Sequence, residues 1–179
     1  MANTWTALFA DVAIGTANKS MADIWNPSGS ARIIKVHKIY ALNNVITAVS
    51  GGINTFQIAK ITALSVAGTE ITPVKHDTTQ ENWSSNTCSA HYASTVTEGD
   101  VFCTFCLSSD EATVRGVVDF DYWSKIHSLS LVWNIGSYDS GFLQPIIIRP
   151  DQGLHIKFVS GTASVGVLTT IIEFTTEAE

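Results

Sequence analysis

Residues 144–174 read QPIIIRPDQGLHIKFVSGTASVGVLTTIIEF, and this stretch decides the fold class. Its PDQG segment (residues 150–153) suits a tight turn, because proline presets φ early in a turn and glycine tolerates positive φ late. Beyond the turn, the apolar residues of LHIKF (residues 154–158) alternate with His155 and Lys157, which is the period of a strand with one buried face. We therefore expect a hairpin and a return strand, with His155 on the polar face.

Strand patterns continue through the rest of the chain. Residues 31–42 (ARIIKVHKIYAL) are rich in β-branched and aromatic types, and their alternation slips near His37, where a β-bulge would explain it. Residues 53–66 (INTFQIAKITALSV) show a second slipped alternation. The best helical candidate, Asn18–Trp25, is short. About eight to ten strands at spacings of about 8–12 residues favour a sandwich or jelly roll over a helical or α/β fold.

The length of 179 residues fits one domain, because all-β sandwiches and barrels commonly reach this size undivided. No internal repeat and no Pro/Ser-rich linker divides the sequence. The sequence therefore predicts an all-β protein, a single-domain antiparallel β-sandwich that is jelly-roll-like and covers residues 16–179. Residues 1–15 are expected to form an extended N-terminal arm or an edge strand.

Charged residues are scarce. They make up 15% of the chain, against 45% hydrophobic residues, whereas about 25% charged is usual. No apolar run reaches the roughly 20 residues that a membrane span requires, so we expect no membrane contact. Either much of the surface is covered by other chains, or it is an ordinary β-sheet surface coated with Ser, Thr and Asn.

The net charge of −6 and the pI near 5.2 argue against nucleic acid as a partner. Nucleic-acid binding needs a basic surface that displaces counterions, and no large Lys/Arg cluster is visible. The first residues, MANTWTALFADVAIG, lack the basic start and long apolar core of a signal peptide. We therefore expect folding in a cytoplasm.

The three cysteines, Cys88, Cys103 and Cys106, show neither a disulfide nor a zinc pattern. Cys103 and Cys106 form a C-x-x-C inside an apolar strand, where positions three apart point to opposite faces. No second pair accompanies them. We expect buried, inert thiols and no bound metal.

The polar side chains suggest little catalytic chemistry. The histidines show no H-x-H or H-x-x-x-H spacing: His37, His76, His91, His127 and His155. His76, Asp77 and Glu81 could form a cation or acid–base site, although a turn in which Asp77 caps neighbouring amides is the commoner arrangement. Asp119 and Asp121 would point the same way on a strand, which suits a glycosidase pair or, more often, a solvated face. Nucleophile-elbow and phosphate-loop motifs are missing from the sequence, so we expect no enzyme and no cofactor.

The aromatic residues offer the best candidate binding groups. Trp83 and Tyr138 lie in polar loop segments, where exposed rings could anchor a protein interface or stack on sugar rings. We favour an interface for Trp83. Trp123 and Trp133 lie in or beside strands, and we expect them to fill the core.

Three segments carry a resemblance to a known group of proteins: RIIKVHKIYALNN, TPVKHDT and the closing QPIIIRPDQGLHIKF…EFT. Together they resemble small jelly-roll or sandwich virion proteins of tailed bacteriophages, including head decoration (cement) proteins. This resemblance implies a structural protein of the virion, made in the host cytoplasm. Its partner would be the major capsid protein or another virion protein. It supplies no catalytic residue.

Our leading hypothesis is that the chain binds and stabilises a capsid lattice through many weak interfaces, and we expect a homo-oligomer. The N-terminal arm carries Trp5, Leu8 and Phe9 with little charge, so it could lie across a neighbouring subunit. The alternative is a phage tail protein, or a receptor-binding or carbohydrate-binding module that uses Trp83, Tyr138 and His91.

Overall fold

The computed structural model describes residues 2–15, 17–44, 53–85, 88–108, 130–134, 144–161 and 166–179. Five residues named above lie outside these ranges: Asp119, Asp121, Trp123, His127 and Tyr138. Within them, no helix is long and apolar enough to cross a membrane.

The described residues form twelve strands and no helix. The strands are β1 (Asn3–Ala13), β2 (Ser20–Asn26), β3 (Arg32–Asn44), β4 (Ile53–Val66), β5 (Thr69–Glu70), β6 (Val74–Lys75), β7 (Ser89–Tyr92), β8 (Thr95–Ser108), β9 (Ser130–Asn134), β10 (Ile146–Ile148), β11 (Gln152–Gly161) and β12 (Val167–Ala178). The best helical candidate of the sequence, Asn18–Trp25, is not a helix, because β2 occupies most of that segment and nearly all of its side chains are buried.

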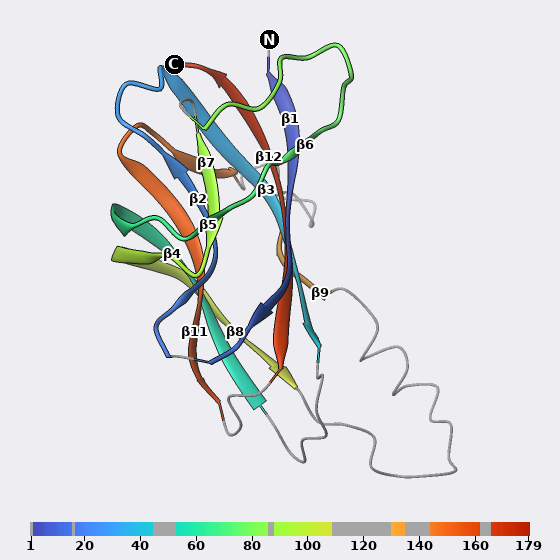
Figure 1. The fold of residues 1–179 in the computed structure, drawn as a ribbon, viewed down its shortest axis with the longest axis vertical. Helices are drawn as coiled ribbons and strands as arrows, with labels where there is room; N and C mark the ends of the chain where they lie inside the picture. The colour runs from blue at the N-terminus through green and yellow to red at the C-terminus, as the bar shows by residue number, and fades with distance from the viewer. Residues whose placement is uncertain are drawn as a thin grey trace.

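Two antiparallel sheets pack face to face (Figure 1). Sheet A has the order β10-β3-β12-β1-β6, with β9 also paired to β3. Sheet B has the order β5-β7-β2-β11-β4-β8. The long strands thus alternate between the sheets as 10-3-12-1 and 2-11-4-8, which is the strand order of a jelly roll. The predicted all-β, jelly-roll-like sandwich is confirmed.

The core lies between the sheets and is built from the inward-facing positions of both. From Leu168 to Thr176 of β12 every second residue is buried, and Ile172 and Phe174 are among them. Phe56, Phe158 and Ile156 face them from sheet B. Because alternate residues of a strand point to opposite sides, the apolar residues of each strand gather on the inner face, which is shielded from water.

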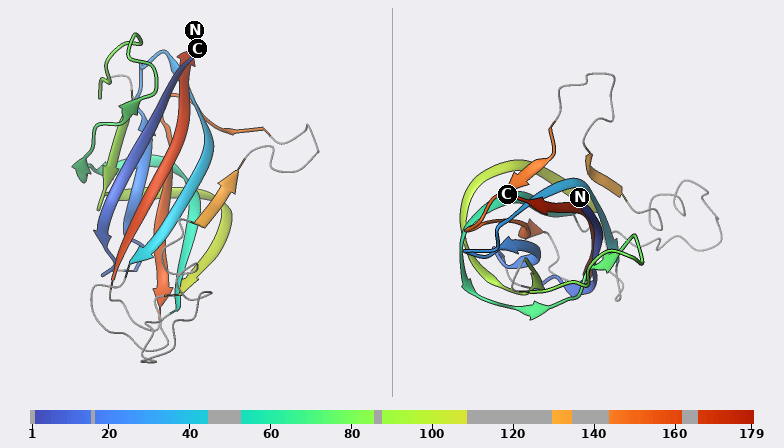
Figure 2. Two further views of the ribbon diagram at one scale, coloured as in Figure 1. Left: turned by 90° about the vertical axis from the view of Figure 1, so that its right-hand side faces the viewer. Right: turned by 90° about the horizontal axis from the view of Figure 1, so that it is seen from above.

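Residues 3–13, expected as an arm or an edge strand, form β1 within the sheet of their own domain. β1 pairs along its length with β12, and its other edge meets β6 through only Trp5 and Thr6. Asn3 lies opposite Thr176, so both chain ends leave the molecule at the same pole (Figure 2, left).

The slipped alternation near His37 has the expected cause. The register between β3 and β12 shifts where Lys38 faces Glu173 and Val36 faces Phe174, so His37 is the extra residue of a β-bulge. The bulge lets Val36 and Ile39, which are three positions apart, both point into the core.

Sheet B closes on itself through a two-stranded ribbon, which we define as residues 61–70 and 91–98. In it, the end of β4 pairs with the start of β8, and β5 pairs with β7. Because β7 also pairs with β2, the ribbon returns to the middle of sheet B. The strands of the ribbon curve round β2 in the view from above (Figure 2, right).

The bend of the ribbon depends on two special residues. Gly68 lies so close to the opposite strand that an added Cβ would be 2.0 Å from the Tyr92 carbonyl oxygen and 2.7 Å from the Ser94 amide nitrogen. Ala93 has a φ of 58°, which is rare for a residue with a side chain. Its amide donates to the Ser20 carbonyl at 2.8 Å, so the bend is fastened directly to β2.

The turn before β11 also differs from expectation. The positive φ of 59° belongs to Asp151, while Gly153 is already in the strand. A Cβ on Gly153 would meet the Ile24 carbonyl oxygen at 2.7 Å and Trp25 at 2.9 Å. The glycine is therefore needed for close packing against β2.

His155 was expected on the polar face of its strand, in a solvated or interface position, but it is buried within its own domain. The side chains of His155 and Lys157 both lie on the face of β11 turned away from the core, yet His155 is fully buried and Lys157 is 9% exposed. Ala59 and Ile61 of β4 are also buried without belonging to the main core. The reason is that the ribbon covers this second face of sheet B.

Candidate interaction surfaces and a buried ionisable cluster

The outer face of sheet A carries a row of apolar side chains across four strands. Leu8 of β1 lies opposite Ile171 of β12, Ile171 opposite Tyr40 of β3, and Tyr40 opposite Leu131 of β9. Leu8 is 50% and Leu131 46% exposed, and the two central residues are half-buried. Directly opposite residues of neighbouring strands lie about 5 Å apart, so these four side chains form one continuous strip, the outer row.

Polar groups border the outer row. On one side, Lys38 and Glu173 form an ion pair of 3.6 Å between Nζ and Oε2, with both side chains partly exposed. On the other side, the Asp11 amide donates to Thr169 Oγ1 at 3.1 Å. An apolar centre with a polar rim is the usual anatomy of a protein interface.

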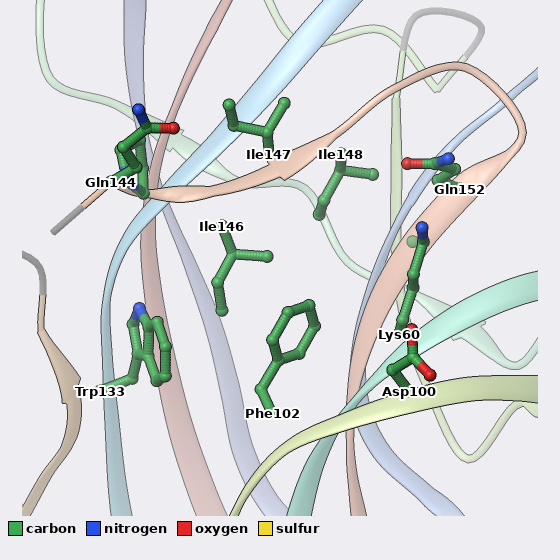
Figure 3. A pocket seen from close by; sticks show the side chains of 11 residues that line it. Lys60, Asp100, Phe102, Trp133, Gln144, Ile146, Ile147, Ile148 and Gln152 are labelled. Carbon is green, nitrogen blue, oxygen red and sulfur yellow. The ribbon is translucent and has the colours of Figure 1, made fainter.

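A second surface lies at the open edge of the sandwich, where β8 and β4 of sheet B face β9 and β10 of sheet A. This edge pocket has a volume of about 380 Å³. Phe102 and Trp133 meet edge to face at 6.2 Å, with Ile146 beside them (Figure 3). Lys60 and Asp100 lie at the opposite end of the pocket (Figure 3). The pocket therefore offers an aromatic wall and a charged end.

Under the ribbon lies a cluster of ionisable residues that the sequence did not predict. Asp23 of β2 is fully buried, and its carboxylate accepts hydrogen bonds from Ser94 Oγ and, at 3.5 Å, Ser20 Oγ. His91 Nδ1 lies 3.3 Å from Asp23 Oδ1. His155 is directly opposite Asp23 in the register of β11 and β2. This row places a carboxylate between two imidazoles.

A second ion pair closes the far side of this cluster. Lys157 Nζ donates to Glu98 Oε2 at 2.5 Å, and the other carboxylate oxygen lies 3.6 Å from His155 Nε2. Neither ring nitrogen of His155 has a hydrogen-bond partner. Unpartnered buried polar atoms are uncommon, because each costs roughly 1–3 kcal/mol of folding free energy.

The two imidazoles titrate in opposite directions. The hydrogen bond from His91 to Asp23 raises the pKa of His91 above its ordinary value, against the effect of burial. Burial lowers the pKa of His155 to about 4, although Glu98 and Asp23 favour its charged form. His155 is therefore neutral near pH 7.

The cluster does not have the geometry of a nucleophilic triad. In such a triad the imidazole lies between the serine and the carboxylate, so that it can take the hydroxyl proton. Here Asp23 lies between Ser94 and His91, and the serine hydroxyl donates directly to the carboxylate. Across the part of the chain that the structure describes, no group of three or more His, Cys, Asp or Glu side chains could hold a metal ion.

The predicted interface residues at the N-terminus separate by face. Trp5 and Phe9 point into the core of their own domain and are 3% and 0% exposed, and Trp5 Nε1 donates to Thr176 Oγ1 at 3.0 Å. Leu8 points outward and begins the outer row. Among these three, only Leu8 has an exposed side chain.

Trp83 does not stand free in its loop. It is half-buried at the end of the core, where its ring packs edge to face on Trp5 at 5.2 Å and on Phe174 at 6.0 Å. Tyr138, its proposed companion, lies outside the described residues. His91, the third residue of the sugar-binding alternative, is buried with Asp23. Trp133 packs partly on the core, as expected, and also lines the edge pocket.

The loop around Asp77 has the predicted turn. The Thr79 amide donates to Asp77 Oδ1 at 2.8 Å, and this bond lowers the pKa of Asp77. His76 Nε2 lies 2.6 Å from Thr6 Oγ1, and Glu81 forms an ion pair with Arg32. Asp77 thus shapes the turn, while His76 and Glu81 tie the loop to β1 and β3 of sheet A.

The expectation of uniformly buried thiols is wrong for β8. Cys88 is buried, Cys103 is half-buried and Cys106 is exposed. Burial raises the pKa of Cys103. Cys106 lies opposite Thr55 of β4, and its Sγ is 3.5 Å from Thr55 Oγ1 on an exposed part of the sheet.

The sequence missed Ile171, Tyr40 and Leu131 as surface candidates. Each is an apolar residue on the outward phase of an alternating strand, which is the one signal that could have identified them. Their alignment depends on register across four strands, which no single segment encodes. Comparison with known proteins does not extend the list, since the chain matches no protein-family model, no curated protein and no solved structure.

Proposed function

We propose that this chain is a structural virion protein that binds and stabilises a phage capsid lattice through its outer row. The supporting observation is the strip of Leu8, Ile171, Tyr40 and Leu131 across sheet A. Contiguous exposed apolar patches are uncommon on monomeric proteins and often serve as interaction sites. The phage context comes from the sequence resemblance alone.

The size of the outer row suits a multivalent role. Four side chains cover on the order of a few hundred Å², whereas a stable interface buries about 800 Å² on each partner. One such contact would be weak. Many copies bound to a repeating lattice, or joined in a homo-oligomer, would add their contacts and reach high avidity. The partner in this proposal is the major capsid protein or another virion protein.

The test uses a charge placed in the outer row. Leu8→Asp and Leu131→Asp should each lower cosedimentation of the purified protein with particles from the native source of the chain at least tenfold. Val66→Asp is the matched control, because Val66 is 62% exposed on the distant ribbon, and it should bind as wild type. Unchanged binding by both outer-row variants, or a wild-type protein that stays a partnerless monomer in light scattering, would overturn the proposal.

The edge pocket favours a second candidate, a receptor-binding or carbohydrate-binding module. Sugar rings stack on aromatic faces while their hydroxyl groups bond to charged and amide side chains, and the pocket offers Phe102 and Trp133 together with Lys60 and Asp100. Glycan-array binding that Phe102→Ala abolishes would support this function. A blank array would leave the lattice proposal ahead.

A further inference from the structure

The ribbon is fastened to β2 by a short seam. β7 pairs with β2 through three residues, Ser89, Ala90 and His91, whereas β4 pairs with β11 through eight register positions from Gly153 to Gly161. One further backbone bond, from the Ala93 amide to Ser20, holds the bend. A seam this short can open locally while the rest of the sandwich stays folded.

Several ionisable side chains are buried between the ribbon and the outer face of β2 and β11, a space that we call the chamber. Burial disfavours the charged form of such groups. Around His155 lie Asp23 from β2, Glu98 from β8 and Lys157 from β11 itself. His91 of β7 contacts Asp23 from the other side. Glu70 of β5 faces His91. From β4, Gln57 lies opposite Lys157, Ala59 lies opposite His155, and Ile61 lies opposite Gly153 on the same face. Asp23 and one oxygen of Glu98 already have cationic or hydroxyl partners. A positive charge on His155 would gain only the second oxygen of Glu98, 3.6 Å from Nε2, and this attraction does not offset the cost of burial.

We propose that the ribbon is an acid-sensitive latch and that His155 is its sensor: protonation of the buried, unpartnered imidazole releases β7 from β2. When the latch is open, water reaches His155 and stabilises its charged form. When it is closed, both ring nitrogens lack a hydrogen-bond partner, so the closed latch holds the neutral ring. Acid therefore favours the open ribbon.

Whether acid opens or closes the ribbon depends on how the pKa of each histidine differs between the open and the closed state. For His155 the open state has the ordinary pKa of 6.5 and the closed state a pKa of about 4. The open state therefore binds the proton first, and opening grows as the pH falls from 6.5 toward 4. His91 acts oppositely, because the closed latch raises its pKa through Asp23. Its contribution to closure is complete below pH 6.5 and is lost as the pH rises through the raised pKa.

The test measures hydrogen exchange of the amides in residues 89–92, corrected for the intrinsic pH dependence of exchange. Between pH 7.5 and 4.5, protonation of His155 alone should raise opening of the seam about 70-fold if its pKa moves between 6.5 and 4. The opposing titration of His91 makes the rise in wild type smaller than this. The amides of β12, residues 168–174, serve as the reference for global unfolding and should change much less. Parallel loss of protection in both segments would overturn the latch.

Variants separate the two histidines. His155→Leu removes the sensor without removing a hydrogen bond and should make the acid response nearly flat. His91→Gln is the matched control and should keep the acid response while losing the alkaline one. An acid response in His155→Leu as large as in wild type would refute the role of His155. Should that variant fail to fold, His155→Gln and an NMR titration of the His155 ring in wild type replace it, and a ring pKa at or above 6.5 would refute the proposal.

Discussion

Sheet A and sheet B share a jelly roll but treat their second faces differently. The outer face of sheet A meets solvent with half-exposed rows such as Lys38 and Glu173 beside Tyr40 and Ile171. The corresponding face of sheet B is covered by the ribbon, and His155 on it is fully buried. A residue that faces away from the core of a sandwich can therefore still be buried, because an extension of its own sheet can fold over that face.

This difference separates two uses of a polar face. In sheet A, ionisable groups lie near water, where their charge costs little and apolar neighbours remain available to a partner. In sheet B, Asp23 and His91 are buried and pair with each other, and the buried Lys157 pairs with Glu98. Sheet A thus has the exposed apolar surface that the proposed recognition requires. Sheet B has the buried ionisable groups that the proposed response to pH requires.

The largest expected effect comes from placing a carboxylate on the outer face of each sheet in turn. Ile61→Asp in β4 should destabilise the protein by about 3–5 kcal/mol or prevent folding, because the new charge is buried beside Glu98 without a partner. Ile171→Asp on the outer face of sheet A should cost only about 1 kcal/mol. Urea unfolding midpoints measure both, and equal costs would contradict the proposed difference between the faces.

A smaller effect is expected where the ribbon bends. Gly68→Ala should cost about 3 kcal/mol, since the added methyl group would collide with backbone atoms of Tyr92 and Ser94 that cannot rotate away. Gly15→Ala is the control, because a Cβ there would have nothing within 4 Å. Thermal or urea unfolding distinguishes them. If Gly68→Ala is as stable as Gly15→Ala, the tight bend is not required.

The smallest effect concerns ion pairs. Lys38→Ala removes a partly exposed pair on sheet A and should change the free energy of unfolding by less than about 0.5 kcal/mol. Lys157→Ala leaves Glu98 without its cation in the covered chamber and should cost several times more. The free energies of unfolding of the two variants at pH 7 provide the comparison, and a larger loss from Lys38→Ala would reverse it.

Local features of the fold could be predicted because the sequence encodes them within a few residues. Alternation in residues 154–158 identified a strand, the slip near His37 identified a bulge, and Asp77 identified its turn. In each case the determining neighbours are close along the chain.

Features that depend on distant segments could not be predicted. His155 shows the alternation of a solvated residue, but it is buried because residues 91–98 return over it. Trp83 has polar neighbours in sequence but apolar ones in space, Trp5 and Phe174. Leu8 was identified as an interface candidate, while its partners in the outer row became visible only through the strand register.

The pairing of Asn3 with Thr176 has a practical consequence. Two chain ends that leave the molecule at the same pole can be joined by a short linker, so a circular permutant could keep every strand while opening the chain elsewhere. A domain fused to either end would also project from that pole. Leu8 lies five residues along β1, about 17 Å away, so a fused cargo would leave the outer row uncovered and the protein could serve as a display anchor.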